Sequence, residues 1–266
     1  MQDETIRPQS ETCTIIVRGQ RLRIAIRSGD GTRTPLLLMN GFGVNLEVLR
    51  WFVDALDPAY VVIRFDVPGI GGSPAPLIPY RSSGHAWLVS KMLNQLGYQQ
   101  IDVLGVSWGG ALAQQFAFQY SRRCRRLILV STATGALMVP GHSWALAQMA
   151  TPRRYMDPDH MEENVTGLYR GKVRTHPEFA HEFAHSIRTG GLQGFFYQML
   201  GGVGWTSLAW LPFLWQPTLI MHCLIPHSKL YIFHDGHLGV GTSARELAQV
   251  VDQFLTAPVS SSTSGA

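Results

Sequence analysis

A serine flanked by glycines stands near the middle of the chain, in the G-x-S-x-G sequence of residues 105–109. The apolar run 101–104 precedes it and the helix-forming run 111–120 follows it. A strand, a sharp turn and a helix in this order expose a nucleophilic hydroxyl at the turn. The sequence therefore predicts Ser107 as a nucleophile and the Trp108 amide as a donor to a developing oxyanion, with a purely structural glycine turn as the alternative.

A second backbone donor is expected after another apolar run. The segment 40–43, Asn-Gly-Phe-Gly, follows the apolar run 36–39. The N–H of Phe42 is the candidate partner of the Trp108 amide, and two such donors make an oxyanion hole. A glycine turn ahead of the next helix is the alternative. At Asp66, which begins a glycine-rich segment, we expect a structural role, the organisation of that loop.

A histidine near the end of the chain is the candidate general base. Such a base should lie downstream of the serine, on a loop after the last strand. His237 satisfies both conditions, because it follows the apolar run 229–233 and stands next to Gly236 in a glycine turn. We predict that His237 takes the proton from Ser107. The other histidines nearby are incidental in this interpretation: His222, His227 and His234.

Residues 181–185, His-Glu-Phe-Ala-His, suggest a different chemistry. They match H-E-x-x-H, which on a helix places two imidazoles on one face for zinc. A catalytic zinc site needs a third ligand, but residues 186–221 contain no Asp, Glu or His. The sequence therefore predicts an exposed polar helix face here and no metal site. No other motif indicates a cofactor.

The order of elements around these residues indicates an α/β protein. Residues 13–28 alternate between apolar and charged side chains around Gly19, which predicts an antiparallel hairpin with one solvated face. Short continuous apolar runs, typical of strands buried on both faces of a parallel sheet, follow at 36–39, 61–63, 101–104, 127–130, 216–221 and 229–233. Helical segments are expected at 46–56, 87–96, 111–120 and, with Ser243 as N-cap and Glu246 in the first turn, 243–255. We expect a mostly parallel sheet with helices on both faces.

The alternation of strand and helix stops after residue 132. Residues 133–212 are rich in Trp, Phe, Met and Gly without a β-rich run, and a stretch of this length is too long for a plain connection. We predict a helical cap, or lid, over 133–212, and a core formed by residues 1–132 and 213–256. The low-complexity tail 257–266 is expected to be disordered.

Composition narrows the range of partners. A net charge of +4 and the basic run at residues 122–126 would suit acidic partners. That run lies between a helix and a strand, where charged connectors are ordinary, so we expect no nucleic-acid partner. The sequence has no apolar run of about 18 residues and no apolar stretch behind a basic start, which predicts a cytoplasmic protein without a membrane span. It gives no indication of oligomeric state.

Several of these segments together resemble the α/β-hydrolase superfamily. They are residues 40–43, 66–73, 105–116 and 235–238, in this order among the strands. Within this superfamily, the chain resembles the intracellular medium-chain-length poly(3-hydroxyalkanoate) depolymerases of pseudomonads. Three further segments indicate this resemblance: 138–141 (MVPG), 152–155 (PRRY) and 204–207 (GWTS). The resemblance implies an α/β-hydrolase fold. It also implies hydrolysis of ester bonds in a hydrophobic storage polyester, or in related acyl esters, at granules inside the cell.

The chain departs from that family at one place. In the family, an acid-bearing segment follows the strand that matches residues 218–221 and supplies the carboxylate of the catalytic triad. Here only seven residues, 222–228, separate Met221 from Lys229, and none of them is acidic. Loss of this carboxylate typically costs about 10⁴-fold in rate, so a dyad of serine and histidine would be slow.

The missing carboxylate leaves several interpretations open. Asp235, two residues before His237, is the nearest substitute acid. An alternative function is that of a non-catalytic pseudo-hydrolase, which binds the same apolar polymer or granule surface without turnover. A third interpretation is a truncated product of low stability, because a missing crossover helix exposes apolar sheet surface. The short connector can still join parallel strands, since it reaches about 25 Å and a return along a strand needs about 17 Å.

Overall fold

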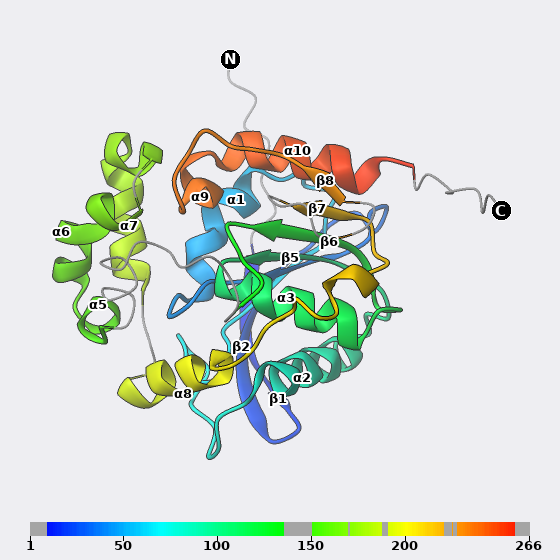
Figure 1. Cartoon of the computed structure of the whole chain (residues 1–266), viewed down its shortest axis with the longest axis horizontal. Helices are drawn as coiled ribbons and strands as arrows, with labels where there is room; N and C mark the ends of the chain where they lie inside the picture. The colour runs from blue at the N-terminus through cyan, green and yellow to red at the C-terminus, as the bar shows by residue number, and fades with distance from the viewer. Residues whose placement is uncertain are drawn as a thin grey trace.

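The computed structural model describes residues 10–135, 151–169, 171–187, 191–220, 225 and 228–258. Within these ranges the strands form one sheet in the order β1-β2-β4-β3-β5-β6-β7-β8 (Figure 1). The strands are β1 (Ser10–Val17), β2 (Gln20–Arg27), β3 (Leu36–Met39), β4 (Val62–Phe65), β5 (Ile101–Val106), β6 (Cys124–Val130), β7 (Thr218–Ile220) and β8 (Ser228–Leu230). The described helices are α1 (Arg50–Ala55), α2 (Ser82–Gln95), α3 (Trp108–Gln119), α5 (Arg153–Met156), α6 (Pro158–Tyr169), α7 (Pro177–Ser186), α8 (Leu192–Gly202), α9 (Gly239–Thr242) and α10 (Ala244–Thr256), with 3-10 turns η1 (Leu46–Leu49), η2 (Gly171–Thr175) and η3 (Leu211–Phe213).

The N-terminal hairpin and the strands that follow it confirm the expected α/β fold. β1 and β2 pair antiparallel around a turn at Arg18 and Gly19, whose φ values are 51° and 83°. Glycine accepts this left-handed conformation at little steric cost. β2 also pairs antiparallel with β4, and the pairs from β4 through β3, β5, β6 and β7 to β8 are all parallel. The sheet is therefore mostly parallel with an antiparallel hairpin at one edge.

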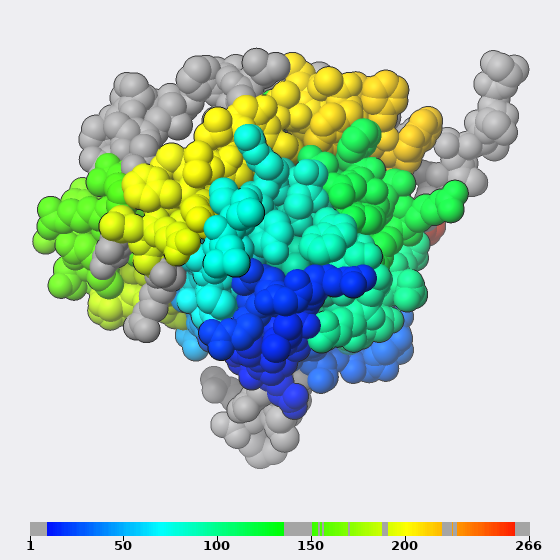
Figure 2. All heavy atoms as spheres, turned by 90° about the horizontal axis from the view of Figure 1, so that it is seen from below, coloured from blue at the N-terminus to red at the C-terminus, as the bar shows by residue number. Residues whose placement is uncertain are grey.

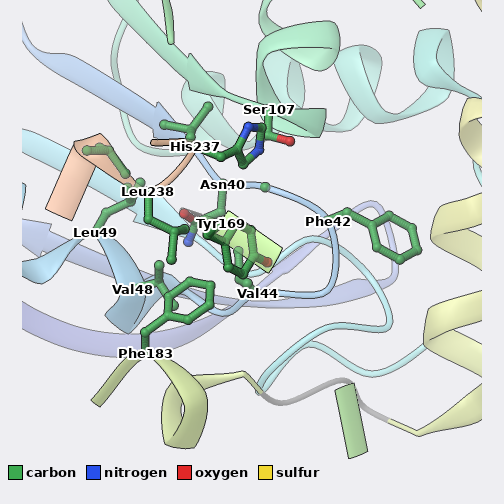
Figure 3. A pocket seen from close by; sticks show the side chains of 13 residues that line it. Asn40, Phe42, Val44, Val48, Leu49, Ser107, Tyr169, Phe183, His237 and Leu238 are labelled. Atoms are coloured by element: carbon green, nitrogen blue, oxygen red, sulfur yellow. The ribbon is translucent and has the colours of Figure 1, made fainter. Parts of the chain in front are cut away.

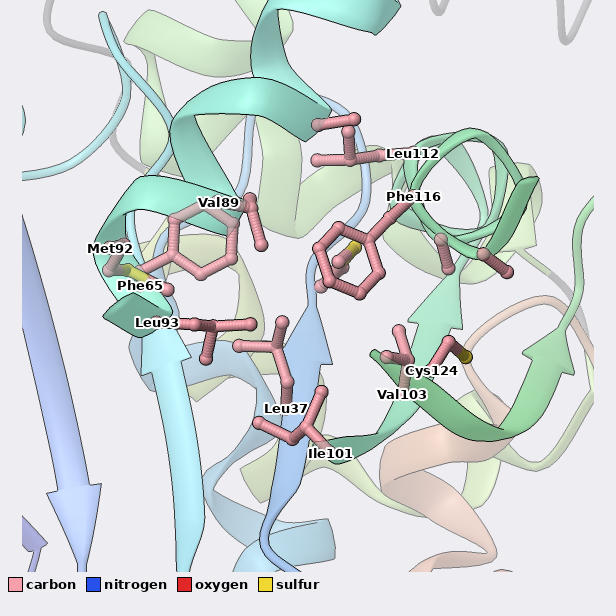
Figure 4. Close-up of a cluster of buried hydrophobic side chains, with 14 of the residues drawn as sticks. Leu37, Phe65, Val89, Met92, Leu93, Ile101, Val103, Leu112, Phe116 and Cys124 are labelled. Atoms are coloured by element: carbon pink, nitrogen blue, oxygen red, sulfur yellow. The ribbon is translucent and has the colours of Figure 1, made fainter. Parts of the chain in front are cut away.

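Consecutive residues of the central strands are buried on opposite faces of the sheet. Leu37 and Met39 belong to the cluster that α2 and α3 cover, whereas Leu36 and Leu38 belong to the cluster that α1 and α10 cover. Figure 4 shows the first cluster, in which Phe116 of α3 packs among side chains of α2 and the strands. Because both faces are covered, these strands are continuous apolar runs rather than alternating ones.

Helices α5 to α8, which we call the cap helices, have a core of their own. Their buried side chains Tyr155, Met161, Phe183 and Phe195 form one cluster, which also includes Val44 from the loop after β3. The division into a core of 1–132 and 213–256 and a cap of 133–212 stays a prediction. Residues 136–150, which include the segment 138–141 of the family resemblance, lie outside the described part of the chain.

Helix α8 packs against the loop that follows β4, as Figure 2 shows where the yellow and cyan surfaces meet. A Cβ atom on Gly194 would lie only 1.8 Å from the carbonyl oxygen of Gly69. The hydroxyl of Tyr197 donates to the carbonyl of Leu77, at 3.2 Å. The two glycines therefore allow a backbone approach that fixes α8 on the body of the protein.

The edge of the sheet at β8 differs from the prediction. β7 and β8 pair in parallel although only seven residues, 221–227, connect them, and of these the structure describes Ile225 alone. The strand ends at Leu230, so the expectation of a strand through residue 233 is wrong. The exposed fractions of Leu230 and Ile232 are 49% and 68%. Phe233 packs against the cluster that α1 and α10 cover, but Ile232 is exposed, and the chain leaves the ladder after Leu230.

The C-terminal helix begins where predicted, but its capping box does not form. Ser243 occupies the N-cap position of α10 without a side-chain capping bond, and its hydroxyl donates to Asp235 instead.

Two further expectations can be compared with the described helices and the tail. Helix α2 begins at Ser82 rather than at Trp87. Residues 259–266 of the expected disordered tail lie outside the described residues. None of the described helices is both long and apolar enough to cross a membrane.

Candidate active site

Ser107 stands at a strained turn between β5 and α3. Its φ and ψ are 54° and −119°, a conformation that costs a non-glycine residue about 1–3 kcal/mol. The surrounding structure holds it there. Its N–H donates to Val130 at 2.9 Å, and its carbonyl accepts from the Thr132 hydroxyl at 2.7 Å. The turn confirms the strand, turn and helix expected around residues 105–109, while the role of Ser107 as nucleophile stays a prediction.

The glycines of this turn are required by space. A Cβ atom on Gly109 would lie 2.1 Å from the carbonyl oxygen of Met39, and one on Gly105 would lie 2.4 Å from that of Gly109. Helix α3 can therefore begin directly against the end of β3 only because these residues lack side chains. This brings the first N–H groups of α3, including that of Trp108, to the edge where the loop after β3 starts.

The loop after β3 lies against the serine. A Cβ atom on Gly41 would be 3.6 Å from the Cβ of Ser107, so the loop that contains Phe42 passes close to this side chain. Helix N-termini favour negative charge, which suits an oxyanion at this point. An oxyanion hole formed by the Phe42 and Trp108 amides stays a prediction.

Three side chains of the cap helices that the sequence analysis missed hold this loop. The Oε1 atom of Gln198, a buried residue of α8, accepts the N–H of Gly43 at 2.8 Å. The Phe42 ring turns away from the serine (Figure 3) and packs edge-on against Tyr155 and Phe195 of the cap helices. The cap helices therefore fix the conformation of the loop that carries the proposed donor.

Ser107 and His237 line one pocket (Figure 3). Its volume is about 40 Å³, enough for a few water molecules but not for an acyl chain. The opposite wall is apolar and includes Val44 of the loop after β3, Val48 of η1 and Phe183 of α7. The two residues predicted to exchange a proton thus share a small apolar site whose walls include cap residues.

His237 is held by the end of a cap helix. The backbone N–H of His237 donates to the carbonyl of Tyr169 at 3.2 Å. The imidazole ring stacks on the Tyr169 ring, with the centroids 5.9 Å apart and the planes inclined by 19°. Tyr169 in turn packs edge-on against Phe183. The sequence analysis missed Tyr169, because the only local signal was an aromatic residue at the end of an expected cap helix.

Both carboxylate oxygens of Asp235 accept hydrogen bonds from neighbouring segments. One oxygen accepts the N–H groups of Lys172 and Gly236, and the other accepts the hydroxyls of Thr242 and Ser243. Burial raises the pKa of Asp235, but these hydrogen bonds to the charged form outweigh it and hold the pKa below its usual value. The carboxylate thus joins η2 to the start of α10. Its role as substitute acid stays a prediction.

The remaining candidates lie elsewhere. His234 is exposed, and His222 and His227 lie outside the described residues. Asp66 has the structural role that was expected, because its oxygens accept the N–H groups of Leu46 and Gly72.

A buried histidine next to Trp108 gives the fold an acid sensitivity. The ring of His85 lies 5.5 Å from that of Trp108, and burial lowers the pKa of His85 to about 4 because the charged form loses its hydration. In the unfolded chain an imidazole protonates near its ordinary pKa of about 6.5. Between these values the unfolded state binds more protons, so stability falls as the pH is lowered through this window.

We therefore expect His85 to account for a loss of about 2–3 kcal/mol in the free energy of unfolding between about pH 7.5 and about pH 4.5. Urea unfolding of the wild type and of His85→Phe at both pH values measures it. The variant keeps an aromatic ring between Tyr80 and Trp108 but cannot bind the proton. The same acid loss in both proteins would contradict this assignment.

Comparisons with known proteins agree with this fold. A family model described as alpha/beta hydrolase fold matches residues 34–222. A poly(3-hydroxyalkanoate) depolymerase of Ectopseudomonas oleovorans is 45% identical over 258 residues, which cover 91% of this chain and 91% of that protein.

Solved structures share the fold at lower identity. A hydrolase from Pseudomonas aeruginosa has a TM-score of 0.79 at 20% identity, over 93% of this chain and 99% of that one. The enol-lactonase from Burkholderia xenovorans also has a TM-score of 0.79 at 20% identity, over 92% of this chain and 100% of that one. The chain belongs to the α/β-hydrolase fold family and, within it, to the family of the Ectopseudomonas depolymerase.

Proposed function

We propose that this protein is a serine hydrolase of apolar carboxylic esters, with a medium-chain-length polyhydroxyalkanoate or a related acyl ester as substrate. The observation that carries the proposal is the strained turn of Ser107 in the pocket that His237 also lines. The 45% identity to a poly(3-hydroxyalkanoate) depolymerase supports the substrate class. A cytoplasmic location, with association to storage granules, belongs to the same proposal.

The proposed reaction assigns one role to each of these groups. The Ser107 oxygen attacks the ester carbonyl while His237 takes its proton, and the amides of Phe42 and Trp108 stabilise the oxyanion. His237 then protonates the leaving alcohol. Water, deprotonated by His237, then attacks the acyl carbonyl, and His237 returns the proton to the Ser107 oxygen as the carboxylic acid leaves. No metal or cofactor takes part in this scheme.

The proposed enzyme works without a carboxylate in the usual place. Residues 222–228 contain no acid, and both oxygens of Asp235 accept hydrogen bonds from other groups. The contacts of Tyr169 with His237 supply part of the orientation that a triad acid normally gives. We therefore expect a slow hydrolase.

The substrate must displace part of the cap to reach the serine. A pocket of about 40 Å³ does not admit an acyl chain, and its wall includes Phe183 and Tyr169 of the cap helices. The cluster of Tyr155, Phe195 and Phe42 next to it offers apolar surface for such a chain once the helices part. This favours oily esters over charged ones.

Covalent labelling tests the nucleophile. The wild type is expected to react with a fluorophosphonate probe and to hydrolyse a medium-chain p-nitrophenyl ester, and Ser107→Ala is expected to abolish the labelling. Because a missing acid already removes about 10⁴-fold and a missing serine about 10⁶-fold, the hydrolysis rate should fall by only about 10²-fold further. Labelling that persists in the variant would refute the proposal.

The oxyanion loop gives a second test on the same assay. Gln198→Leu removes the acceptor of the Gly43 N–H in a residue of similar size. Loss of one such hydrogen bond, about 1–1.5 kcal/mol, is expected to lower kcat about tenfold with little change in KM, because the loop that carries the oxyanion donor loosens. Gln193→Leu, on the exposed face of the same helix, should leave kcat unchanged. Equal kcat values for both variants would contradict the role of Gln198.

A pseudo-hydrolase is the second candidate, and the connector without an acid favours it. In that case the chain would bind polyester granules without turnover. Co-sedimentation with granules and no measurable hydrolysis would support this function, whereas hydrolysis that His237→Ala abolishes would exclude it.

A further inference from the structure

Three metal-binding side chains meet on the outer surface of the cap helices. His181 and His185 lie one turn apart on α7, and Glu162 faces them from α6. Each offers one ligand atom, and these atoms all lie within 4.8 Å of one another. Two histidines at this helical spacing present their rings on one face, as a metal site requires.

The distances within the cluster suit a metal ion, which would take the place of the proton between His181 and Glu162. The Nδ1 atom of His181 lies 3.0 and 3.1 Å from the two oxygens of Glu162. Ligand atoms around a tetrahedral zinc ion are separated by about 3.3 Å, so little movement is needed. The Nδ1 atom of His185 lies 2.9 Å from the carbonyl of His181 and 3.7 Å from an oxygen of Glu162, so the second imidazole lies beside the same carboxylate.

The site is open to solvent. The exposed fractions of the side chains are 62% for His181, 42% for His185 and 41% for Glu162, so an ion can reach all three. The sequence analysis sought a third ligand only downstream of His185. The structure supplies one upstream, because α6 and α7 pack side by side.

We propose that Glu162, His181 and His185 bind one divalent transition-metal ion of the zinc class, with water completing its coordination. Imidazole and carboxylate ligands suit Zn²⁺ and its neighbours rather than Mg²⁺ or Ca²⁺. This replaces the expectation that the motif is only a polar helix face without a metal.

The metal would have a structural role rather than that of a peptidase centre. In an H-E-x-x-H peptidase the glutamate is the general base. Here the two oxygens of Glu182 contact the indole N–H of Trp51 at 2.8 Å and the guanidinium of Arg50 at 2.7 Å. That glutamate therefore joins α7 to α1. A bound ion would cross-link α6 to α7, the helices whose Tyr169 and Phe183 line the pocket of Ser107.

Titration with zinc tests the site on the untagged full chain. Isothermal calorimetry with ZnCl₂ in a non-chelating buffer is expected to show one saturable site per chain. Glu162→Gln and His185→Gln are each expected to weaken binding by at least about tenfold, the amount that loss of even an outer-shell partner costs. Glu163→Gln, in the next position of α6, and His176→Gln, just before α7, are the matched controls and should bind as the wild type does.

Thermal unfolding provides a readout that separates binding from misfolding. Without metal, all variants should melt cooperatively near the wild-type midpoint. Zinc should raise the midpoint of the wild type and of both controls, but not that of Glu162→Gln or His185→Gln, because only a site in the folded state stabilises it. Absence of saturable binding, or equal affinity in the wild type and the two ligand variants, would overturn the proposal.

Discussion

A crossover helix that carries one aspartate, inserted between Met221 and Lys229, is expected to raise the rate of ester hydrolysis by up to about 10⁴-fold. The sheet order explains why this place is the right one. The carboxyl ends of parallel strands meet at one edge, where Ser107 follows β5 and His237 follows β8. An acid after β7 would enter this edge beside the strand that leads to the histidine. It would fix the tautomer and orientation of the imidazole.

The control is the same insertion with asparagine in place of the aspartate. Both inserted proteins gain a covering helix, so any effect of stability is common to them, and only the charge differs. The measurement is kcat/KM for a medium-chain ester across the pH range. Equal rates for the two insertions would show that the missing carboxylate does not limit this chain, and that another group already orients His237.

Replacing Asp66 by alanine is expected to lower the free energy of unfolding by about 3–5 kcal/mol. Asp66 is only 1% exposed, and it accepts the N–H of Leu46 at 2.7 Å and that of Gly72 at 2.8 Å. Arg23 also lies 3.3 Å from the carboxylate. Alanine leaves these buried donors without an acceptor, and each unsatisfied group costs about 1–3 kcal/mol.

Chemical denaturation measures this loss. Asp66→Asn, which keeps one acceptor oxygen, should lose less stability than the alanine variant. Asp159→Ala, at an exposed position of α6, should change the free energy of unfolding by less than about 0.5 kcal/mol. If the Asp66 and Asp159 variants unfold at the same denaturant concentration, the loop after β4 does not depend on this carboxylate.

The sheet and the serine turn were predictable because their signals are local. Continuous apolar runs mark strands that are covered on both faces, and the sequence places each of the central strands within a few residues of its observed position. The glycines at 105 and 109 are part of a recognisable sequence motif. The structure gives the reason for them, because a Cβ atom at either position would collide with backbone. In each case a short stretch of sequence contains the whole physical reason for the structure.

Other parts depend on contacts between distant segments, and the sequence could not supply them. Gln198 lies 155 residues from Gly43, the residue whose N–H it accepts. Glu162 is separated from His181 by the turn between two helices, so a search for ligands downstream of the motif missed it. The end of β8 was also predicted wrongly, because β propensity at residues 231–233 depends on context and does not by itself decide where an edge strand ends.

The backbone of Ser107 bears on the choice between enzyme and inert binder. Glycine would adopt φ 54° and ψ −119° with less strain than serine does. A protein that only binds, without turnover, would therefore gain stability from the substitution Ser107→Gly. A side chain whose Cβ opposes folding at this position is therefore more readily explained by the proposed nucleophile than by an inert binder.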